Sequence, residues 1–355
     1  MGYPVTLIRG DGIGPEVAEA ARIAVDATGV SLDWNIVDAG AVAIEKYGTP
    51  LPEPMFEAIR DTKIALKGPI STPSGYKFPV TIEICKQLNL FANLRPVQSI
   101  PGVKSYFQDI DLVILRDNTE DLYAGIEFER TSIEAADART FLSKLSGQTI
   151  RDDAAIGVKP ISVLGSRQIV EFALQYAQTH SRRKITVVHQ ANRMKFTDGL
   201  FLDVAREVAK SYPELAFEDQ SVDNVCLQLM QKPQQYDLLV MSNLYGDILS
   251  SLGAGMMGGL GVAPSANIGD DYAVFEAVHG CAPKYAGQNK ANPTALILSG
   301  ALMLQHLGEQ EAATKLQKAV QSVIHAQVVT CDLAASGVEP VGTREMAEAI
   351  AAAMV

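Results

Sequence analysis

Short runs of Val, Ile and Leu alternate with longer amphipathic segments along most of the chain. Two examples are "VTLIRGDGIGPEVAEAARIAVDATG" at residues 5–29 and "DLLVMSNLYGDILSSLGAGM" at residues 237–256. An apolar run of strand length followed by a segment of helical period is typical of β–α units. The pattern therefore predicts an α/β fold with mostly parallel strands. Ligands of such sheets bind beyond the carboxyl ends of the strands, so polar residues that follow each run are the first candidates for chemistry.

The alternation is interrupted between residues 129 and 162, where charges of both signs mix with Gly and Asp and the periodicity is weak. The segment keeps apolar side chains such as Phe141, Leu145 and Ile150, which a disordered linker would lack. We therefore expect an inserted arm or small subdomain here. The Ala-rich end, "REMAEAIAAAMV" at residues 344–355, predicts a closing helix.

Composition narrows the class of protein. The chain has 355 residues, of which 47% are hydrophobic and 20% charged, as in an ordinary globular protein. Its net charge of −11 offers no basic surface for a phosphate backbone, so we do not expect nucleic acid as a partner. The cysteines form no C-x-x-C pair, and the sequence has neither a signal-peptide pattern nor a long apolar stretch. These features predict a cytoplasmic protein with reduced thiols and no membrane partner.

The first polar strand end, "RGDGIGPE" at Arg9–Glu16, joins a predicted strand to a predicted helix, with Pro15 suited to the first helical turn. Its glycines follow a G-x-G-x-G spacing, which differs from the G-x-G-x-x-G of dinucleotide-binding loops. A tight turn that needs glycine conformations is therefore favoured over a cofactor loop.

Further strand ends carry groups suited to an anionic substrate. Arg95 in "LFANLRPV" and Arg116 in "LVILRDN" could together hold a di- or tricarboxylate through bidentate contacts. Either arginine alone is more often part of a surface ion pair. Another strand end, "VVHQANRMKFTDG" from Val187 to Gly199, turns polar at His189.

Candidate metal and phosphate ligands follow later in the chain. Asp247 and Ser251 are four residues apart on a predicted helix, and Asp223 opens another helix. Acidic residues in a first helical turn are more often caps than metal ligands, but two aspartates beside a strand end are compatible with Mg²⁺ or Mn²⁺. In the loop "APKYAGQNK", Lys284 and Tyr285 would suit a nucleotide phosphate, or the loop could simply be solvated.

Taken in order, seven segments resemble those of the isocitrate and 3-isopropylmalate dehydrogenase family: "GDGIGPE", "LRP", "RDNTEDLYAGIE", "VHQANRMKFTDG", "NLYGDILS", "GGLGVAPSANIG" and "HGCAPKYAGQNKANPTA". The resemblance covers essentially the whole chain, and "NTEDLYAGIE" and "APKYAGQ" are most similar to isocitrate dehydrogenases. It implies an isopropylmalate dehydrogenase-like α/β fold, with two α/β domains around a mixed, largely parallel sheet. Residues 1–98 and 250–355 would form a large cofactor-side domain, and residues 99–249 a small domain with the substrate and dimer face. A clasp inserted at about residues 129–162 would help to form a homodimer.

The resemblance also implies a reaction, the NAD(P)-dependent and metal-assisted oxidative decarboxylation of a 2-hydroxy di- or tricarboxylate. A nicotinamide takes a hydride, Mg²⁺ or Mn²⁺ polarises the ketone, CO₂ leaves and the enol is protonated. The implied roles are substrate binding by Arg95, Arg116, Thr81 and Asn192, protonation by Tyr123, and metal binding by Asp223, Asp247 and, weakly, Ser251. Asp247 is also expected to take part in catalysis, and one metal aspartate would reach across the dimer interface.

The residues that match the family's cofactor site are Thr72, His279, Gly280, Ala282, Lys284, Tyr285 and Asn292. Lys284 and Tyr285 match the pair that binds the 2′-phosphate in NADP-using members, where NAD-using members often have an aspartate that repels it. Against this, Cys331 and Ala335 stand where NADP-using bacterial members have a tyrosine and an arginine. The balance favours NADP over NAD.

Gln190 departs from the family pattern, because it occupies the position of the catalytic lysine that takes the hydroxyl proton in the family. A neutral amide cannot act as a general base, and a positioned base contributes about 10²–10⁴-fold to the rate. Ser251 replaces a third metal-site aspartate, and Cys85 replaces a third substrate arginine. Pro79 and Thr81 take the places of a serine and an asparagine that meet the distal carboxylate of isocitrate.

Two interpretations of different class follow. The first is an isocitrate-type dehydrogenase whose activity is weak or directed to another malate-type acid, such as isopropylmalate, homoisocitrate or tartrate. The second is a catalytically impaired paralogue that binds nucleotide or carboxylate and regulates a related subunit. The first is preferred, because the arginine pair, Tyr123, two metal aspartates and the cofactor loop are retained.

Overall fold

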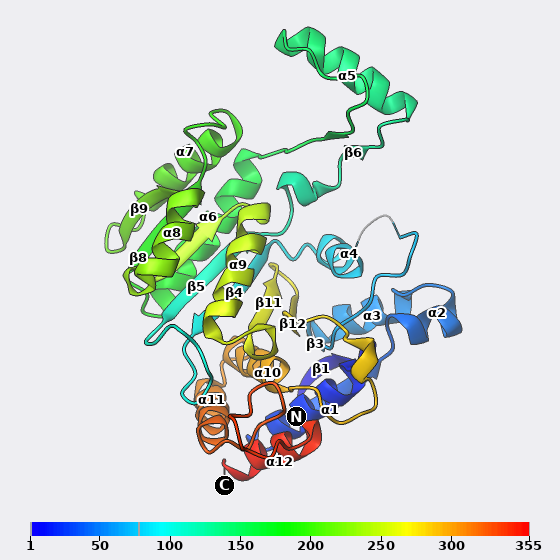
Figure 1. Cartoon of the computed structure of the whole chain (residues 1–355), viewed down its shortest axis with the longest axis vertical. Coiled ribbons are helices and arrows are strands. Elements are labelled where there is room, and N and C mark those ends of the chain that lie inside the picture. Colours follow the sequence, from blue (N-terminus) through cyan, green and yellow to red (C-terminus); the bar gives the residue numbers. More distant parts are fainter. Residues whose placement is uncertain (1, 77–78, 355) are drawn as a thin grey trace.

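A ten-stranded sheet extends through the computed structural model, which describes residues 2–76 and 79–354 (Figure 1). From one edge to the other, the strands are β2 (Leu32–Val37), β1 (Tyr3–Ile8), β3 (Ile64–Lys67), β12 (Ala273–Ala277), β11 (Pro264–Ile268), β4 (Ala92–Gln98), β5 (Asp111–Asp117), β10 (Leu238–Met241), β8 (Lys184–His189) and β9 (Ala216–Ser221). Adjacent strands run parallel except at three central pairs, which are β12 with β11, β11 with β4 and β4 with β5. The mixed, largely parallel sheet is therefore confirmed.

The two kinds of strand differ in their sequences for a physical reason. The parallel strands β8 and β10 are nearly continuous apolar runs, because helices cover both of their faces. In the antiparallel centre, β4 alternates instead: Asn93 and Arg95 lie on one face of the sheet, and Leu94 lies on the other. This alternation carries polar side chains into the middle of the molecule.

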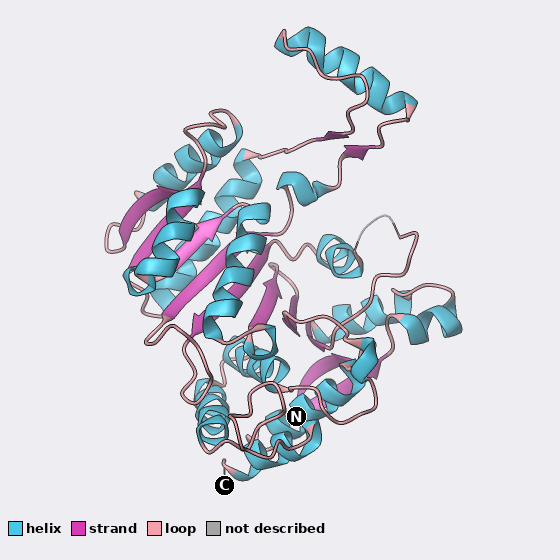
Figure 2. Ribbon diagram, in the orientation of Figure 1, coloured by secondary structure: helices cyan, strands magenta, loops and turns pink. Residues whose placement is uncertain are grey.

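Helices cover both faces of the sheet (Figure 2). The α-helices of the described residues are α1 (Gly14–Asp26), α2 (Ala41–Tyr47), α3 (Glu53–Thr62), α4 (Val80–Gln87), α5 (Ile133–Ser146), α6 (Val163–Thr179), α7 (Thr197–Ala209), α8 (Val222–Gln231), α9 (Asn243–Met257), α10 (Thr294–His306), α11 (Gln310–His325) and α12 (Thr343–Ala352), and α5 lies away from the sheet. α9 packs on β4 and β5, whereas α6 and α10 cover the opposite face of the central strands. The closing helix predicted at the Ala-rich end is present as α12.

The N-terminal glycine segment forms a tight turn between β1 and α1. Gly10 and Gly12 have φ angles of 72° and 60°, which favour glycine. A Cβ at Gly12 would collide with the carbonyl oxygen of Cys281, and the amide of Ile13 donates to that same oxygen at 2.9 Å. The glycines thus meet the steric needs of a turn that is packed against another loop.

An arm spanning residues 127–157 projects from the rest of the molecule (Figure 1). β6 (Glu127–Phe128) and β7 (Ile156–Gly157) form an antiparallel pair within it, and α5 forms its tip. Ser132 caps this helix by accepting a hydrogen bond from the amide of Ala135. Ile133 and Leu145 on α5 are 77% and 68% exposed. The predicted inserted arm is therefore confirmed, and it presents apolar side chains to solvent.

The division into a large and a small domain at residues 98 and 249 stays a prediction, because β4 and β5 join the two parts in one continuous sheet. Buried apolar side chains form one extensive core and a smaller cluster that includes Phe56 and Ile84. Among the helices of the described residues, none combines the length and the apolar composition needed to cross a membrane.

Candidate active site

A small cavity lies between α4 and the central strands, on the face of the sheet that α9 covers, and we call it the front cavity. Its volume is about 60 Å³. The side chains that line it are Thr81, Ile82, Cys85, Asn93, Arg95, Arg116, Asn118, Tyr123, Asn243, Asn267 and Glu276. The fold thus brings together four of the predicted site residues, Thr81, Arg95, Arg116 and Tyr123.

Arg116 and Tyr123 both hold the carboxylate of Asp247. Arg116 Nη1 forms a short ion pair with Asp247 Oδ1, and the Tyr123 hydroxyl donates to Asp247 Oδ2 at 3.0 Å. Gly246 precedes Asp247 in α9, and a Cβ at Gly246 would collide with the side chain of Arg116. The glycine therefore allows an arginine on a strand to reach the start of the helix.

The pKa shifts of Tyr123 and Asp247 are opposite in direction. Burial raises the pKa of Tyr123, and the nearby Asp247 carboxylate raises it further. Burial also disfavours the ionised form of Asp247, but Arg116 and the Tyr123 hydroxyl outweigh this effect and hold the pKa of Asp247 below its ordinary value. At neutral pH, Tyr123 is therefore a protonated donor, and Asp247 is an ionised, weakly basic carboxylate.

Arg95 is a half-buried cation whose Nε is buried and unused as a donor. Its Nη1 donates to Ser250 Oγ on α9 at 2.6 Å, while its Nε is buried with no hydrogen-bond partner among the described residues. Burial and the neighbouring Arg116 lower the pKa of Arg95 to about 10, so the guanidinium stays charged at neutral pH. An unpaired buried donor costs about 1–3 kcal/mol. The site around Arg95 therefore favours an anionic ligand.

A polar network behind the arginines has no counterpart among the predicted site residues. Lys67 Nζ lies 2.6 Å from Glu276 Oε2, and Asn267 Nδ2 donates to Glu276 Oε1 at 2.6 Å. Asn267 Oδ1 accepts in turn from Asn93 at 2.8 Å and from Asn118 at 2.9 Å. In the sequence, the available signal is that Asn93 and Asn267 interrupt apolar strands. Such residues are hydrogen-bonded to one another when a sheet buries them.

Helix α4 contributes Thr81 and Cys85 to the front cavity. Burial raises the pKa of the Cys85 thiol to about 12, so the thiol is neutral, and Asn118 Nδ2 lies 3.8 Å from its sulfur. A neutral thiol cannot supply the charge of the third arginine that the family pattern has at this position. The positive charge that faces the front cavity therefore comes from Arg95 and Arg116.

Gln190 and Asn192 do not line the front cavity of their own chain. The backbone N–H of Gln190 donates to Asp198 Oδ2 at 2.7 Å, while its side-chain Oε1 is buried without a hydrogen-bond partner in the described part of the chain. Asp198 also accepts from Lys159 at 2.6 Å and from the Tyr245 hydroxyl at 3.0 Å. This buried cluster fixes the end of β8, whereas Asn192 is exposed.

The predicted metal residues do not form a complete site within one chain. Ser251 Oγ donates to the backbone carbonyl of Asp247 at 3.0 Å, and Asp223 is exposed in the first turn of α8. Within residues 2–76 and 79–354, no group of three His, Cys, Asp or Glu side chains could hold a metal ion. Mg²⁺ needs only one or two carboxylates when water and substrate oxygens complete its shell. Asp247 therefore fits a metal ion shared with a substrate, and not one held by this chain alone.

The predicted cofactor loop follows β12 and packs against the N-terminal turn. Glu16 of α1 accepts hydrogen bonds from two backbone amides of the loop, including Asn289 at 2.9 Å. His279 Nε2 is buried with no partner among the described residues, and burial lowers the pKa of this imidazole. Lys284 Nζ lies 4.8 Å from the centre of the Tyr285 ring. A neutral ring nitrogen and a cation on an aromatic face fit the adenine side of a nicotinamide dinucleotide.

The other predicted cofactor residues are placed as follows. Gly280 has open space where a Cβ would lie, and Ala282 has a φ of 39° at the start of a short 3₁₀ turn. Asn292 is buried and donates to Asp332 at 2.9 Å. Thr72 lies before α4, where its hydroxyl accepts from the first amide of that helix at 3.2 Å. Thr72 is thus held at α4, while the others follow β12.

The family model for isocitrate/isopropylmalate dehydrogenase matches residues 4–350. The chain belongs to this family. The isocitrate dehydrogenase [NADP] of Archaeoglobus fulgidus is 42% identical, with 98% of this chain and 91% of that protein covered. A regulatory subunit of the mitochondrial isocitrate dehydrogenase [NAD] of Dictyostelium discoideum is also 42% identical, over 93% of this chain and 86% of that protein. Overall identity therefore does not separate a catalytic from a regulatory role.

The fold of this isocitrate/isopropylmalate dehydrogenase family member is close to that of a solved relative. The crystal structure of isocitrate dehydrogenase from Methylococcus capsulatus matches it with a TM-score of 0.89 and 44% identity, and 99% of each chain is covered. The expected isopropylmalate dehydrogenase-like α/β fold is thereby confirmed. The question of function consequently depends on the individual side chains of the site.

Proposed function

We propose that the protein is an isocitrate-type dehydrogenase that catalyses the NAD(P)-dependent, metal-assisted oxidative decarboxylation of a 2-hydroxy tricarboxylate, with turnover reduced by Gln190. One observation carries this proposal: Arg95, Arg116 and Tyr123 converge on the front cavity, and Asp247 joins two of them. Two guanidinium groups, a phenol and a carboxylate in one place suit the binding and protonation of a polycarboxylate.

The substrate carboxylates would bind to Arg95 and Arg116. The Nε of Arg95 is buried without a partner among the described residues, and an anion there would accept a hydrogen bond from it. Arg116 would turn part of its guanidinium from Asp247 to the substrate, which leaves Asp247 free to face the reacting hydroxyl. Thr81 lines the same cavity and would contact the distal part of the substrate.

The proton chemistry depends on Tyr123 and Asp247. Tyr123 would protonate the enol after decarboxylation, since its raised pKa keeps the phenol protonated. Gln190 would hydrogen-bond to the substrate or to a water molecule from a second copy of the chain, but an amide cannot take the hydroxyl proton. Asp247 would take that proton instead. An ionised aspartate is a much weaker base than an amine, and this weakness would make turnover slow.

The cofactor and the metal supply the remaining chemistry. When bound, a nicotinamide would supply a hydride acceptor, and Mg²⁺ or Mn²⁺ would supply a Lewis acid for the substrate oxygen. Asp247 of one chain and Asp223 of a second copy would hold the metal ion together. Asp223 is exposed on α8, and the described residues of a single chain do not supply enough metal ligands. Ser251 would contribute weakly or through water. Lys284 and Tyr285 would bind the 2′-phosphate, which favours NADP over NAD.

A homodimer would complete this site. Leu227 and Met230 on α8 and Ile248 on α9 are 52%, 53% and 54% exposed. These two helices also carry the proposed metal ligands, Asp223 and Asp247. The arm adds exposed Ile133 and Leu145. Surfaces of this kind mark protein interfaces. Light scattering should give the mass of a dimer for the wild type and of a monomer for Leu227→Asp, whereas a monomeric wild type would exclude this arrangement.

A regulatory paralogue is the second candidate, and Gln190 and Ser251 favour it, because both remove chemistry that turnover requires. Such a protein would bind nucleotide or carboxylate and pair with a related catalytic chain. A redirected dehydrogenase, acting on isopropylmalate, homoisocitrate or tartrate, is a variant of the first candidate and is favoured by Thr81 and Cys85. Cys85 lacks the charge of the arginine that the family pattern has at its position, and Thr81 lacks the amide of the asparagine.

The test is to measure NAD(P)H formation by the purified protein from isocitrate, 3-isopropylmalate, homoisocitrate, tartrate and malate, with Mg²⁺ or Mn²⁺. The proposal predicts that isocitrate with NADP gives the fastest reaction, at a low rate. A faster reaction with another acid would redirect the assignment to that acid. If no acid reduces either cofactor while calorimetry shows that NADP binds, the regulatory candidate replaces the proposal.

A further inference from the structure

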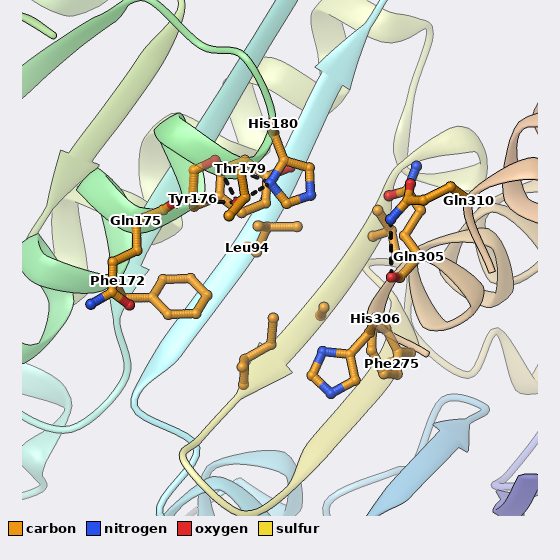
Figure 3. A pocket seen from close by; sticks show the side chains of 13 residues that line it. Leu94, Phe172, Gln175, Tyr176, Thr179, His180, Phe275, Gln305, His306 and Gln310 are labelled. Carbon is orange, nitrogen blue, oxygen red and sulfur yellow. Dashed lines mark hydrogen bonds between the residues drawn. The ribbon is translucent and has the colours of Figure 1, made fainter. Parts of the chain in front are cut away.

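A second cavity lies on the opposite face of the central strands from the front cavity, between α6 and α10 (Figure 3). We call it the rear pocket, and its volume is about 410 Å³. Along β4, Asn93 and Arg95 line the front cavity while Leu94 lines the rear pocket. Along β12, Glu276 lines the front cavity and Phe275 lines the rear pocket. One layer of sheet therefore separates the two cavities, and a ligand in the rear pocket would not touch the substrate arginines.

The rear pocket has aromatic groups on two walls. On the α6 wall, His180 stacks on Tyr176, with ring centres 3.8 Å apart and planes inclined by 13°. On the α10 wall, His306 meets Phe275, with ring centres 5.6 Å apart. Figure 3 shows the imidazoles of His180 and His306 on opposite sides of the rear pocket. Because both imidazoles are open to solvent, each can offer a ring face to a ligand.

The chemistry of the rear pocket is neutral. Among the described residues, its lining contains no Lys, Arg, Asp or Glu. Partial burial lowers the pKa of His180 and of His306, which favours the uncharged imidazoles at neutral pH. Gln175, Gln305 and Gln310 add amide donors and acceptors. A charged ligand would find no counter-ion among the lining residues, whereas a neutral ring with polar edges would meet both stacking surfaces and amides.

We propose that the rear pocket binds an uncharged planar heteroaromatic molecule of the nucleobase or nucleoside class, held between His180 and His306. Its volume of about 410 Å³ is in the range of about 300–1,000 Å³ that small-molecule sites occupy. Stacking on aromatic side chains favours the binding of bases of any kind, because every base has a π face. The glutamine amides select rings that carry both donors and acceptors. This site is distinct from the loop after β12 that we assign to the cofactor.

Adenosine is the probe for this proposal, measured by calorimetry on the full chain with saturating NADP so that the proposed cofactor site is already filled. We expect saturable binding of one adenosine per chain. Replacing both rings, with His180→Ala and His306→Ala together, should weaken binding at least tenfold. His325→Ala is the matched control, because it removes an exposed imidazole at the end of α11 that does not line the pocket. This control should bind adenosine like the wild type.

Several results would overturn the proposal. They are the absence of adenosine binding at millimolar concentration, equal binding by the double variant and the wild type, and complete competition by NADP. Tighter binding of AMP than of adenosine would also contradict it, because the pocket offers no cation for a phosphate. If the double variant does not fold, His180→Ala alone at the exposed end of α6 gives the same test. A protein that fails to bind NADP at all is titrated without it, so failure of the proposed function leaves this test intact.

Discussion

Tyr123 donates a 3.0 Å hydrogen bond to Asp247, although the two residues are 124 positions apart in the sequence. The contact joins a group that can give a proton to a carboxylate that can bind a metal or take a proton. Arg116 holds the other oxygen of the same carboxylate. The phenol, the carboxylate and the guanidinium therefore act as one unit.

Replacing Tyr123→Phe should reduce turnover by about 10²–10⁴-fold, because the phenyl ring keeps the packing but has no proton to give to the enol. Thermal unfolding should show a loss of only about 1 kcal/mol, the value of one hydrogen bond. Tyr106→Phe is the control, since Tyr106 is fully exposed. Similar turnover by Tyr123→Phe and the control would remove Tyr123 from the mechanism.

Replacing Gly246→Ala should weaken substrate binding, because the added methyl group would push Arg116 away from Asp247. We expect the KM for the acid to rise at least tenfold. Gly255→Ala is a matched control in the same helix, where a Cβ would enter open space. Alanine there should be neutral or should stabilise the helix by about 0.5–1 kcal/mol. If both variants keep the wild-type KM, the close approach of Arg116 to α9 does not matter for binding.

Replacing Glu276→Gln should destabilise the protein by about 3–5 kcal/mol at pH 7, because it leaves the buried Lys67 ammonium without its anionic partner. Burial opposes ionisation of Glu276, but Lys67 outweighs it and lowers the pKa of the carboxyl. A carboxyl with a lowered pKa in the folded state stabilises it above the pKa of the unfolded chain, and this contribution is lost as the pH falls.

The stability difference between the wild type and Glu276→Gln should therefore be largest at pH 7 and should shrink as the pH falls below about 4.5, the ordinary value for glutamate. Urea unfolding at several pH values measures it. Glu57→Gln, at an exposed position of α3, is the control and should show little difference at any pH. A difference that grows towards low pH would reverse the assigned direction of the shift.

Replacing Lys284→Ala should weaken the binding of NADP about tenfold and leave NAD unchanged, because only NADP carries the phosphate that Lys284 would meet. Calorimetry with both dinucleotides gives the ratio. Lys290→Ala removes another exposed cation from the same loop and serves as the control. Equal losses for NADP and NAD would show that Lys284 does not select the cofactor.

Much of the fold could be predicted from the sequence, because alternation of apolar runs and helical periods is a local signal. The segment containing Phe141 and Leu145 stood out as an arm for the opposite reason, its weak periodicity. The central antiparallel strands gave no such local signal. The pairing of β4 with β11 brings Asn93 beside Asn267. The two strands are far apart in the chain, so neither segment alone predicts that they pair.

The site was predicted only in part. Arg95 and Arg116 could be chosen from their places at the ends of apolar runs, Tyr123 came from the family resemblance, and all three line one cavity. The ion pair between Lys67 and Glu276 could not be predicted, because in the sequence each residue is a single charge in a short apolar strand. Family resemblance supplied the roles of Gln190 and Asp223, which remain predictions, since a second copy of the chain would be needed to bring them to the front cavity.

The most direct measurement is NADPH formation from isocitrate and Mg²⁺ by the wild type and by Gln190→Lys. The proposed enzyme should reduce NADP slowly but measurably, and Gln190→Lys should be faster by about 10²–10⁴-fold, because it restores a group that can exchange a proton. Gln108→Lys, which adds a lysine at an exposed site, should stay at the wild-type rate. If the wild type and Gln190→Lys both bind NADP and neither reduces it, the protein is a nucleotide-binding paralogue, and the enzymatic proposal is wrong.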